Sequence, residues 1–162
     1  ALAFQALQVA NRMELMPRLV EAAALSQTGR DGHDLVLCRY WQSAWVYGQL
    51  DGLPAEFLER VHSAMVQPDV NVLLDASPET CMARRERRDG AGKAERYEGR
   101  LDRTRKIVEL YRALWHREAP FKRSGRWVVI EAEQPIEGVI RDVLTAIGRR
   151  GAAHEVSHGE GR

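Results

Sequence analysis

An arginine, a hydroxyl and an aromatic ring are grouped in the sequence in a way that suits phosphate binding. Arg39 follows a short apolar run, and Ser43 and Tyr47 come after it, one helical turn apart. A guanidinium can form two parallel hydrogen bonds with a phosphate, and residues four apart on a helix are neighbours. The group therefore indicates a phosphate site with an aromatic wall. The alternative is that Trp41, Trp45 and Tyr47 form a core and that Arg39 is a surface charge.

A basic segment from Arg84 to Lys106 is the second group that indicates anion binding. Ten cationic and five acidic side chains give it a local charge of +5, although the whole chain has 24 Lys and Arg against 23 Asp and Glu. Cations around a glycine-containing loop suit a mobile lid that closes over a polyphosphate. A solvated charged turn is one alternative. A nucleic-acid site is another, although the segment lacks the interleaved aromatic rings that stack on bases.

The glycines of this segment do not form a phosphate loop. The pattern G-x-x-x-x-G-K-[ST] would require glycine at 87 and serine or threonine at 94, where the chain has Arg87 and Ala94. A phosphate loop also leaves a strand, whereas Gly90-Ala91-Gly92-Lys93 follows a predicted helix. The segment is therefore interpreted as a lid and not as a phosphate cradle.

Arg12, one helical turn beyond Gln8, is the third candidate ligand. It lies within a long helical pattern whose surrounding face is otherwise apolar. A buried guanidinium is costly unless it is paired or bound to a ligand. The pattern thus predicts either a ligand-binding arginine or a structural arginine with a protein partner.

Helices and short strands alternate along the chain and must position these groups. Three apolar runs at 35–38, 70–74 and 127–130 are predicted strands, because each is too short for a helix. Each is apolar at consecutive positions, which indicates a parallel sheet that is covered on both faces. The fold is therefore α/β, and ligands are expected at the carboxyl ends of the strands. Amphipathic patterns and caps predict helices at 1–27, 54–65, 78–88, 101–115 and 136–147, the second of them started by Pro54 and the third with Ser77 as its N-cap.

Length and composition indicate one soluble domain at 1–149, followed by a disordered tail at 150–162 that has almost no apolar anchor. The near-neutral charge gives no general attraction to nucleic acid or to an anionic membrane. No apolar run approaches the roughly 20 residues of a membrane span. Cys38 and Cys81 lie far apart and outside any metal-binding motif, which favours a reduced, cytoplasmic setting and predicts no metal ligands in the chain.

Taken in order, four motifs resemble those of the thymidylate kinase family. That family has a helix with an arginine, a strand ending Asp-Arg-Tyr before a serine and an aromatic residue, a Pro-Asp before a strand ending Leu-Asp, and a basic lid ending Arg-Tyr-Glu. The counterparts here are Arg12, Arg39-Tyr40 with Ser43 and Tyr47, Pro68-Asp69 through Leu74-Asp75, and Arg96-Tyr97-Glu98. The resemblance extends from residue 1 to about residue 148.

The resemblance implies a three-layer, P-loop-kinase-type parallel sheet flanked by helices. It also implies transfer of the γ-phosphoryl group of ATP to thymidine monophosphate with Mg²⁺, in a cytoplasmic homodimer to which the apolar surface of the first helix is suited. By the same resemblance, the substrate-binding residues are Gln8, Arg12, Arg39, Ser43, Tyr47 and Tyr97. The catalytic residues are Arg39, Arg88 and Arg96, and the lid that binds ATP contains Arg84, Arg85, Arg88 and Lys93.

The sequence departs from the family at three places. Cys38 stands where the family has an aspartate near the metal, and Gln8 stands where an aromatic ring stacks on thymine. The family's first two strands and its phosphate loop have no counterpart, so we expect an acceptor-side portion that is inactive or nearly so by itself. Two rivals stay open: a P-loop kinase for another small acceptor, favoured by Gln8, and a nucleotide-binding relative without catalysis, favoured by Cys38.

Overall fold

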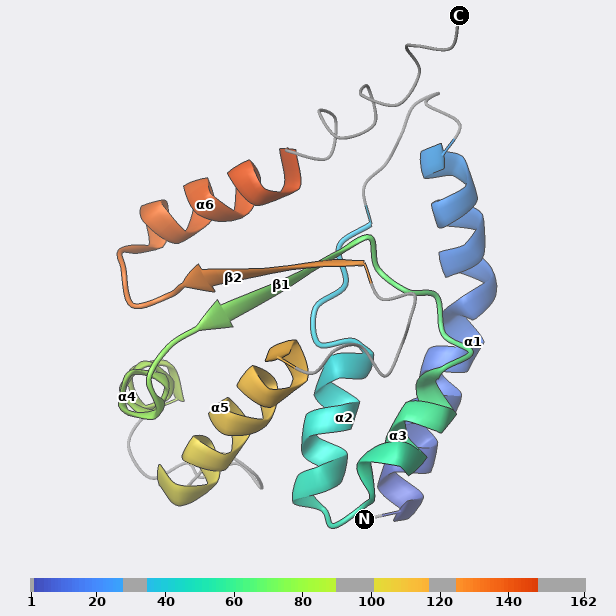
Figure 1. Cartoon of the computed structure of the whole chain (residues 1–162), viewed down its shortest axis with the longest axis horizontal. Coiled ribbons are helices and arrows are strands. Elements are labelled where there is room, and N and C mark those ends of the chain that lie inside the picture. Colours follow the sequence, from blue (N-terminus) through green and yellow to red (C-terminus); the bar gives the residue numbers. More distant parts are fainter. Residues whose placement is uncertain (1, 28–34, 90–100, 117–124, 149–162) are drawn as a thin grey trace, which may run out of the picture. The chain divides into compact units, whose positions relative to one another are not determined.

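The computed structural model describes residues 2–27, 35–89, 101–116 and 125–148 (Figure 1). None of the described helices combines the length and the apolar character needed to cross a membrane. All five predicted helices are present, as α1, α3, α4, α5 and α6, but α3 ends at His62 and does not reach Met65 as predicted. The order of elements is α1 (Leu2–Gln27), α2 (Trp41–Leu50), α3 (Ala55–His62), β1 (Val70–Asp75), α4 (Pro78–Asp89), α5 (Leu101–His116), β2 (Arg126–Glu131) and α6 (Ile136–Gly148).

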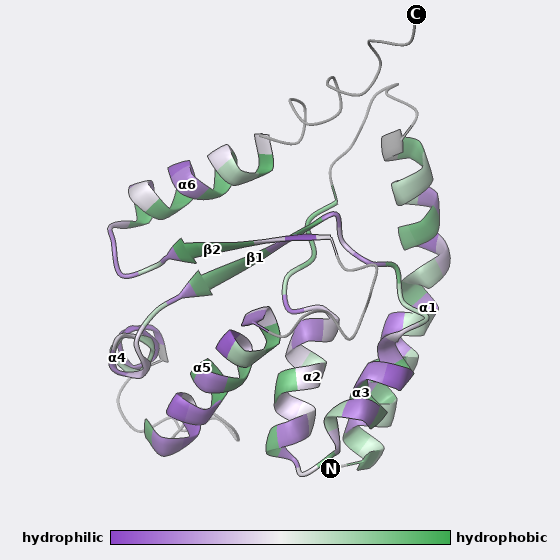
Figure 2. Ribbon diagram, in the orientation of Figure 1, coloured by the Kyte–Doolittle hydropathy of each residue, from purple (hydrophilic) through white to green (hydrophobic). Residues whose placement is uncertain are grey.

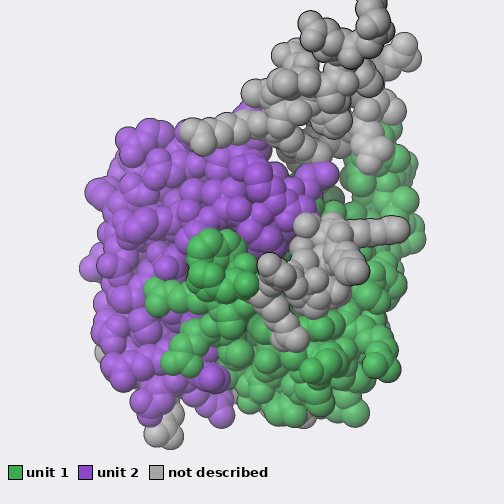
Figure 3. Space-filling view, viewed as in Figure 1, with its two compact units in different colours: residues 1–68, 109–124 green, residues 69–108, 125–162 purple. Residues whose placement is uncertain are grey.

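The chain divides into two compact units (Figure 3). The first unit contains residues 1–68 and 109–124, and the second unit contains residues 69–108 and 125–162. Helix α5 contributes its first part to the second unit and its last part to the first unit. A single domain over 1–149 therefore stays a prediction, and the tail predicted at 150–162 lies outside the described residues.

A two-stranded parallel sheet organises the second unit. Strands β1 and β2 pair over their whole lengths, from Val70 opposite Arg126 to Asp75 opposite Glu131. Both strands are rich in valine, leucine and isoleucine, which pack well on a pleated surface. The two apolar runs predicted as strands in this unit are therefore confirmed.

Helix α6 lies against this sheet with one apolar face (Figure 2). Val139 and Ala146 pack with Ile130 of β2, and Val143 and valines of both strands lie against the same cluster. Full burial of one branched side chain contributes roughly 1.5–3 kcal/mol to folding. The helical period of these apolar residues thus decides which face of α6 meets the sheet.

Helix α4 begins at a serine cap. Ser77 Oγ accepts the Thr80 N–H at 3.2 Å, as the sequence predicts. Glu133, which follows β2, accepts the Ser77 N–H at 2.8 Å and the Thr80 hydroxyl at 3.0 Å. Hydrogen bonds from Ser77 are the largest cause of the lowered pKa of the Glu133 carboxyl. The cap therefore ties the start of α4 to the loop that follows β2.

The core of the first unit lies where α2 meets α3. Trp41 and Trp45 of α2 and Leu58 of α3 are almost fully buried. Gly48 permits this close approach, because a Cβ at its position would lie 2.6 Å from Leu58 Cδ2. The two tryptophans thus belong to a core, as the alternative interpretation of the sequence proposed, whereas Tyr47 is half-buried.

The strand predicted at 35–38 is not formed. Leu35, Val36 and Leu37 are exposed, Val36 at 81%, and no strand pairs with them among the described residues. A strand needs a hydrogen-bonded neighbour, which composition alone does not supply. The expected coverage of both sheet faces is also incomplete, since Leu74 of β1 is 53% exposed. The described residues form a mostly helical α/β structure with a small parallel sheet, and three layers stay a prediction.

Candidate functional site

Arg39 stands at the start of α2 in a left-handed backbone conformation. Its φ is 58°, and it is the one residue other than glycine with a positive φ in the described part of the chain. Such a conformation costs on the order of 1 kcal/mol for a residue with a Cβ. The Arg39 guanidinium carbon lies 4.9 Å from the centroid of the Tyr47 ring, within the range of a cation–π contact. The structure thus brings two predicted site residues together.

The first turn of α2 adds a second attraction for anions. Tyr40 is the N-cap residue and makes no side-chain cap hydrogen bond, and the turn contains no acidic residue. The backbone N–H groups and the dipole at such an end favour a negative charge. Arg39 immediately precedes this end, so its charge and the helix dipole act at the same place.

Arg12 of α1 and Tyr40 interact electrostatically. Burial lowers the pKa of Arg12, and Tyr40 partly opposes this change. Burial raises the pKa of Tyr40, and Arg12 partly opposes that change. The Tyr40 hydroxyl donates to Met16 Sδ at 3.6 Å, and a thioether is a weak acceptor. Arg12 and Tyr40, the residue next to Arg39, therefore influence each other's pKa.

The guanidinium of Arg12 has more donors than partners. Its Nη1 donates to Gln8 O at 3.2 Å, which is its one protein hydrogen bond within the described part of the chain. A guanidinium carries five N–H donors. Among the described residues, no carboxylate shifts the pKa of Arg12. A half-buried cation with this surplus of donors is suited to an anionic ligand.

Ser43, predicted to bind substrate, already has a protein partner. Its hydroxyl oxygen lies 2.8 Å from the hydroxyl oxygen of Tyr111, and either group can be the donor. A hydroxyl can both donate and accept, so Ser43 keeps capacity for a second partner. Sequence reasoning missed Tyr111, because an amphipathic pattern does not show which distant residue a helix meets.

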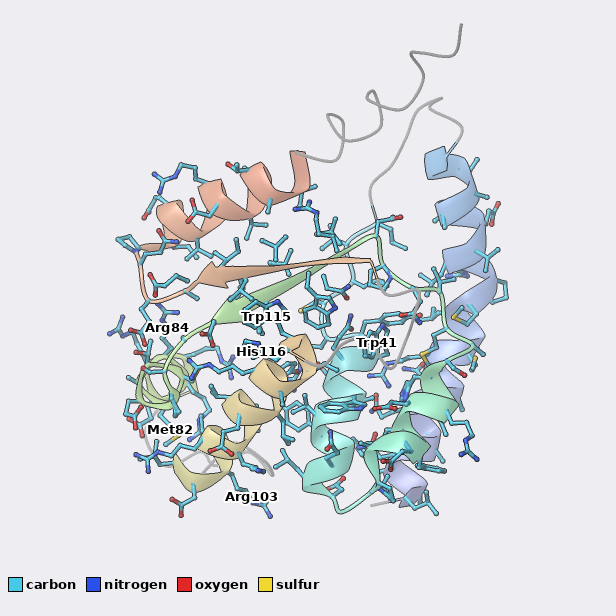
Figure 4. All side chains as sticks on the ribbon, viewed as in Figure 1. Trp41, Met82, Arg84, Arg103, Trp115 and His116 are labelled. Carbon is cyan, nitrogen blue, oxygen red and sulfur yellow. The ribbon has the colours of Figure 1, made fainter. Side chains whose placement is uncertain are left out.

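A basic hollow of about 340 Å³ lies between α4 and α5 within the second unit. Figure 4 shows Arg84 and Met82 projecting from α4. The hollow brings three predicted lid arginines together, whereas Lys93, Arg96 and Tyr97 lie outside the described residues. The residues that line it are Cys81, Met82, Arg84, Arg85, Arg88, Thr104, Ile107 and Val108.

Similarity to known sequences extends over most of the chain. The sequence profile of the family described as thymidylate kinase matches residues 2–143. The chain belongs to the thymidylate kinase family. It therefore groups with transferases of the kinase type that bind nucleotides.

Individual members of the thymidylate kinase family show the extent of the match. A probable thymidylate kinase of Pyrobaculum aerophilum is 32% identical over 140 residues, which cover 86% of this chain and 65% of that protein. A probable thymidylate kinase of Caldivirga maquilingensis is 31% identical over 118 residues, which cover 73% of this chain and 53% of that protein. A thymidylate kinase of Desulforapulum autotrophicum is 28% identical over 128 residues, which cover 74% of this chain and 54% of that protein. The chain thus spans between 53% and 65% of the lengths of these relatives.

The two positions at which this chain departs from the thymidylate kinase motifs differ in their surroundings. Gln8 is half-buried and lines a hollow on α1 together with Leu7, Asn11 and Glu14. Cys38 is exposed in the segment that precedes α2. The backbone carbonyl of Gln8 accepts a hydrogen bond from Arg12 Nη1, one helical turn along α1.

The described residues do not fit a magnesium site by themselves. They contain no group of three His, Cys, Asp or Glu side chains placed to hold a metal ion. Magnesium prefers oxygen ligands in octahedral geometry, and the Cys38 sulfur is a poor substitute for a carboxylate. No step of the mechanism is therefore assigned to a metal held by these residues.

Proposed function

We propose that the complete protein transfers the γ-phosphoryl group of ATP to the 5′-phosphate of a deoxynucleoside monophosphate, with thymidine monophosphate as the first candidate. The observation that carries this proposal is the half-buried Arg12, a cation with one protein hydrogen bond among the described residues, beside Tyr40 at the start of α2. Relatives that are named thymidylate kinases support this choice of acceptor.

In this proposal the first unit holds the acceptor. Arg39 grips the 5′-phosphate through two parallel hydrogen bonds, and Arg12 adds a second cation. The contact with Tyr47 limits the freedom of the Arg39 side chain before the nucleotide arrives, so less entropy is lost on binding. Tyr47 forms one wall of the nucleoside pocket, with Gln8 and Ser43 as further contacts. An acceptor phosphate oxygen then attacks the γ-phosphorus, and the bond to the departing ADP breaks.

The second unit holds the donor in the same proposal. Arg84, Arg85 and Arg88 line one basic hollow. In the proposal, Lys93 and Arg96 belong to the lid and Tyr97 belongs to the wall of the nucleoside pocket. Arg88 and Arg96 stabilise the charge that is spread over the transferring phosphoryl group. Mg²⁺, which the resemblance to the family implies, would come with ATP and would offset phosphate charge, and no described residue is assigned as its ligand.

The proposal is tested by replacing Arg12 in the complete protein. Loss of one charge-assisted contact from a half-buried site costs about 1.5–3 kcal/mol, so Arg12→Met is expected to lower kcat/KM for thymidine monophosphate about 100-fold. Arg18→Met is the matched control, because Arg18 is exposed on the same helix, and it is expected to stay within about twofold of the unaltered protein. Absence of ADP release with every nucleoside monophosphate would remove the enzyme proposal.

Gln8 and Cys38, the two positions that depart from the family motifs, each favour a different alternative function. Experiments on the same protein can distinguish these alternatives. Gln8 favours another acceptor, and comparison of a panel of monophosphates in the ADP-release assay separates the two acceptor assignments. Cys38 favours a nucleotide-binding relative without catalysis, for which calorimetry shows binding while turnover is absent. Cys38→Asp then tests whether the loss of activity lies at that position.

We further propose a cytoplasmic homodimer that is formed through α1. Six of its large apolar side chains are exposed, although Leu19 is buried, and such a surface suits contact with another chain. Leu7→Glu places a charge on this face and is expected to yield a monomer in sedimentation equilibrium, if the unaltered protein is a dimer. The exposed apolar residues of α1 are Leu2, Phe4, Leu7, Leu15, Val20 and Leu25.

A further inference from the structure

Tyr111, in the part of α5 that belongs to the first unit, makes a short hydrogen bond with Ser43 of α2. Ser43 is 7% exposed, and its Oγ lies 2.8 Å from the Tyr111 hydroxyl oxygen. Both residues belong to the first unit, although they are 68 positions apart in the sequence. Tyr111 stands outside every motif that the sequence offered, yet it contacts a residue predicted to bind substrate.

The chemistry of the two hydroxyl groups favours Tyr111 as the donor in this bond. A phenol is a stronger acid than the aliphatic alcohol of serine, so it is the better hydrogen-bond donor. Tyr111 then donates its proton and occupies one lone pair of Ser43 Oγ. The Ser43 O–H must point to a different acceptor, and no side chain among the residues that the structure describes supplies one. A buried hydroxyl proton in this position is suited to an acceptor on a ligand.

Arg39 and Tyr47 place an anion beside this hydroxyl. Ser43 and Tyr47 are one turn apart in α2, so their side chains are neighbours on one face of the helix. Helical side chains lean toward the N-terminus, so the Tyr47 ring leans toward the turn that carries Ser43. The Arg39 guanidinium carbon lies 4.9 Å from the centroid of that ring. A phosphate bound by Arg39 therefore meets the same face of α2 as the Ser43 hydroxyl.

We propose that Tyr111 is a positioning residue, which holds the Ser43 hydroxyl so that it donates to a phosphate oxygen of the acceptor nucleotide. A phosphate oxygen without a proton only accepts hydrogen bonds, so the direction runs from Tyr111 to Ser43 to the phosphate. The bond from Tyr111 restricts rotation of the serine hydroxyl before the ligand binds, and consecutive hydrogen bonds strengthen one another. The inference rests on the proposed function, since it takes the 5′-phosphate of the acceptor as the ligand.

A double-mutant cycle on the complete protein provides the first test. Tyr111→Phe removes the phenolic oxygen alone, and it is expected to raise KM for thymidine monophosphate about fivefold. The turnover number kcat and KM for ATP are expected to stay within about twofold, which a general loss of structure would not allow. Ser43→Ala is expected to raise KM for thymidine monophosphate about tenfold. The double variant is expected to match Ser43→Ala, because Tyr111 acts through the serine.

Ser63→Ala is the control for this cycle. It removes the hydroxyl of an exposed serine in the same unit, which donates to Arg60 O at 2.8 Å, and its KM is expected to stay within about twofold of the original value. An unchanged KM in Tyr111→Phe would overturn the positioning role. Effects that multiply in the double variant would overturn it too, since the two residues would then act independently.

Carbon NMR of the unaltered protein provides a second test, which does not depend on any variant folding. With tyrosine labelled at the ring carbon that bears the oxygen, the Tyr111 signal is expected to shift when thymidine monophosphate binds. Thymidine at saturation lacks the phosphate and is expected to shift this signal less. An unmoved signal while the nucleotide binds, or equal shifts with the two ligands, overturns this inference alone. Absence of binding by every nucleoside monophosphate tested overturns the proposed function as well.

Discussion

The two units hold their arginines in different ways. In the first unit Arg12 is half-buried, borders Tyr40 and has no carboxylate among the causes of its pKa shift. In the second unit Arg105 donates to Glu79 at 3.0 Å with both side chains exposed, and the charge of Arg84 helps to lower the pKa of Glu133. A cation beside a carboxylate is already compensated, whereas a desolvated cation without a carboxylate nearby is not. The density of positive charge along a sequence is therefore a poorer guide to an anion site than the surroundings of each arginine.

The largest effect concerns Arg39, which is exposed but belongs to the acceptor site proposed for the first unit. Arg39→Met removes a cation at the start of α2 and is expected to lower kcat/KM for thymidine monophosphate about 100-fold in the ADP-release assay. Arg105→Met removes an equal charge from the exposed pair of the second unit, and its effect is expected to stay within about twofold. Equal losses in the two variants would break the distinction between the units.

Packing in the first unit gives the next largest effect. Gly48→Ala places a Cβ 2.6 Å from Leu58 Cδ2, and overpacking of this kind lowers the free energy of unfolding by about 1–3 kcal/mol. Gly148→Ala is the matched control at the end of α6, where no atom lies within 4 Å of an added Cβ. Urea unfolding should therefore show a loss at position 48 and none at position 148. A double-mutant cycle with Leu58→Ala isolates this contact, because the loss caused by Gly48→Ala is expected to be smaller in the Leu58→Ala background than in the unaltered protein.

The buried imidazole of His62 in the first unit should make the free energy of unfolding depend on pH. Burial lowers the pKa of His62 below its ordinary value of 6.5, so the folded state binds fewer protons than the unfolded state as pH falls below about 6.5. The free energy of unfolding is then expected to decrease by up to about 1.4 kcal/mol per pH unit from this group, and the loss ends below the folded-state pKa. Above pH 6.5 both states are neutral and the group contributes no slope.

Urea unfolding between pH 4.5 and pH 8, on the unaltered protein and on His62→Gln, measures this contribution, with these limits chosen to bracket a pKa of about 6.5. The variant is expected to have the shallower slope below pH 6.5. Superimposable slopes would mean that His62 takes up its proton as readily in the folded protein as in the unfolded chain.

The cap of the second unit gives the smallest effect. Ser77→Ala removes the oxygen that accepts the Thr80 N–H at the start of α4, and a lost cap lowers the free energy of unfolding by about 1 kcal/mol. Ser77→Asp keeps an acceptor at the cap and should remain close to the original stability. Thermal unfolding of the two variants side by side measures the difference, and an Ala variant as stable as the Asp variant would show that the cap is dispensable.

Local signals were sufficient to predict most elements of the fold. The cap at Ser77 and the helical period of Val139 and Val143 depend on neighbours within two turns, and both are confirmed. The strand predicted at 35–38 failed because pairing depends on a distant partner, which a run of Leu35, Val36 and Leu37 cannot specify.

The candidate site was predicted less completely, for the same physical reason. Arg12, Arg39 and Tyr47 carry visible chemistry, and the structure joins Arg39 to Tyr47. The left-handed backbone conformation of Arg39 could not be predicted from the sequence, because glycine and asparagine are the residues that usually adopt it. The burial of His62 could not be predicted either, since a histidine in a short helix gives no indication of burial. The lid role of Lys93, the catalytic role of Arg96 and the place of Tyr97 in the nucleoside pocket stay predictions.

At Arg39 the backbone conformation lowers the stability of the fold, whereas the side chain serves the proposed recognition of the ligand. Asparagine or glycine would adopt this conformation at lower cost, so a selection for resistance to heat alone should favour their appearance here. The same replacements remove the guanidinium that the proposed chemistry requires. Laboratory evolution for heat resistance alone and laboratory evolution for activity should therefore select different residues at position 39 first. An arginine that persists under selection for activity would show that ligand recognition outweighs stability at this position.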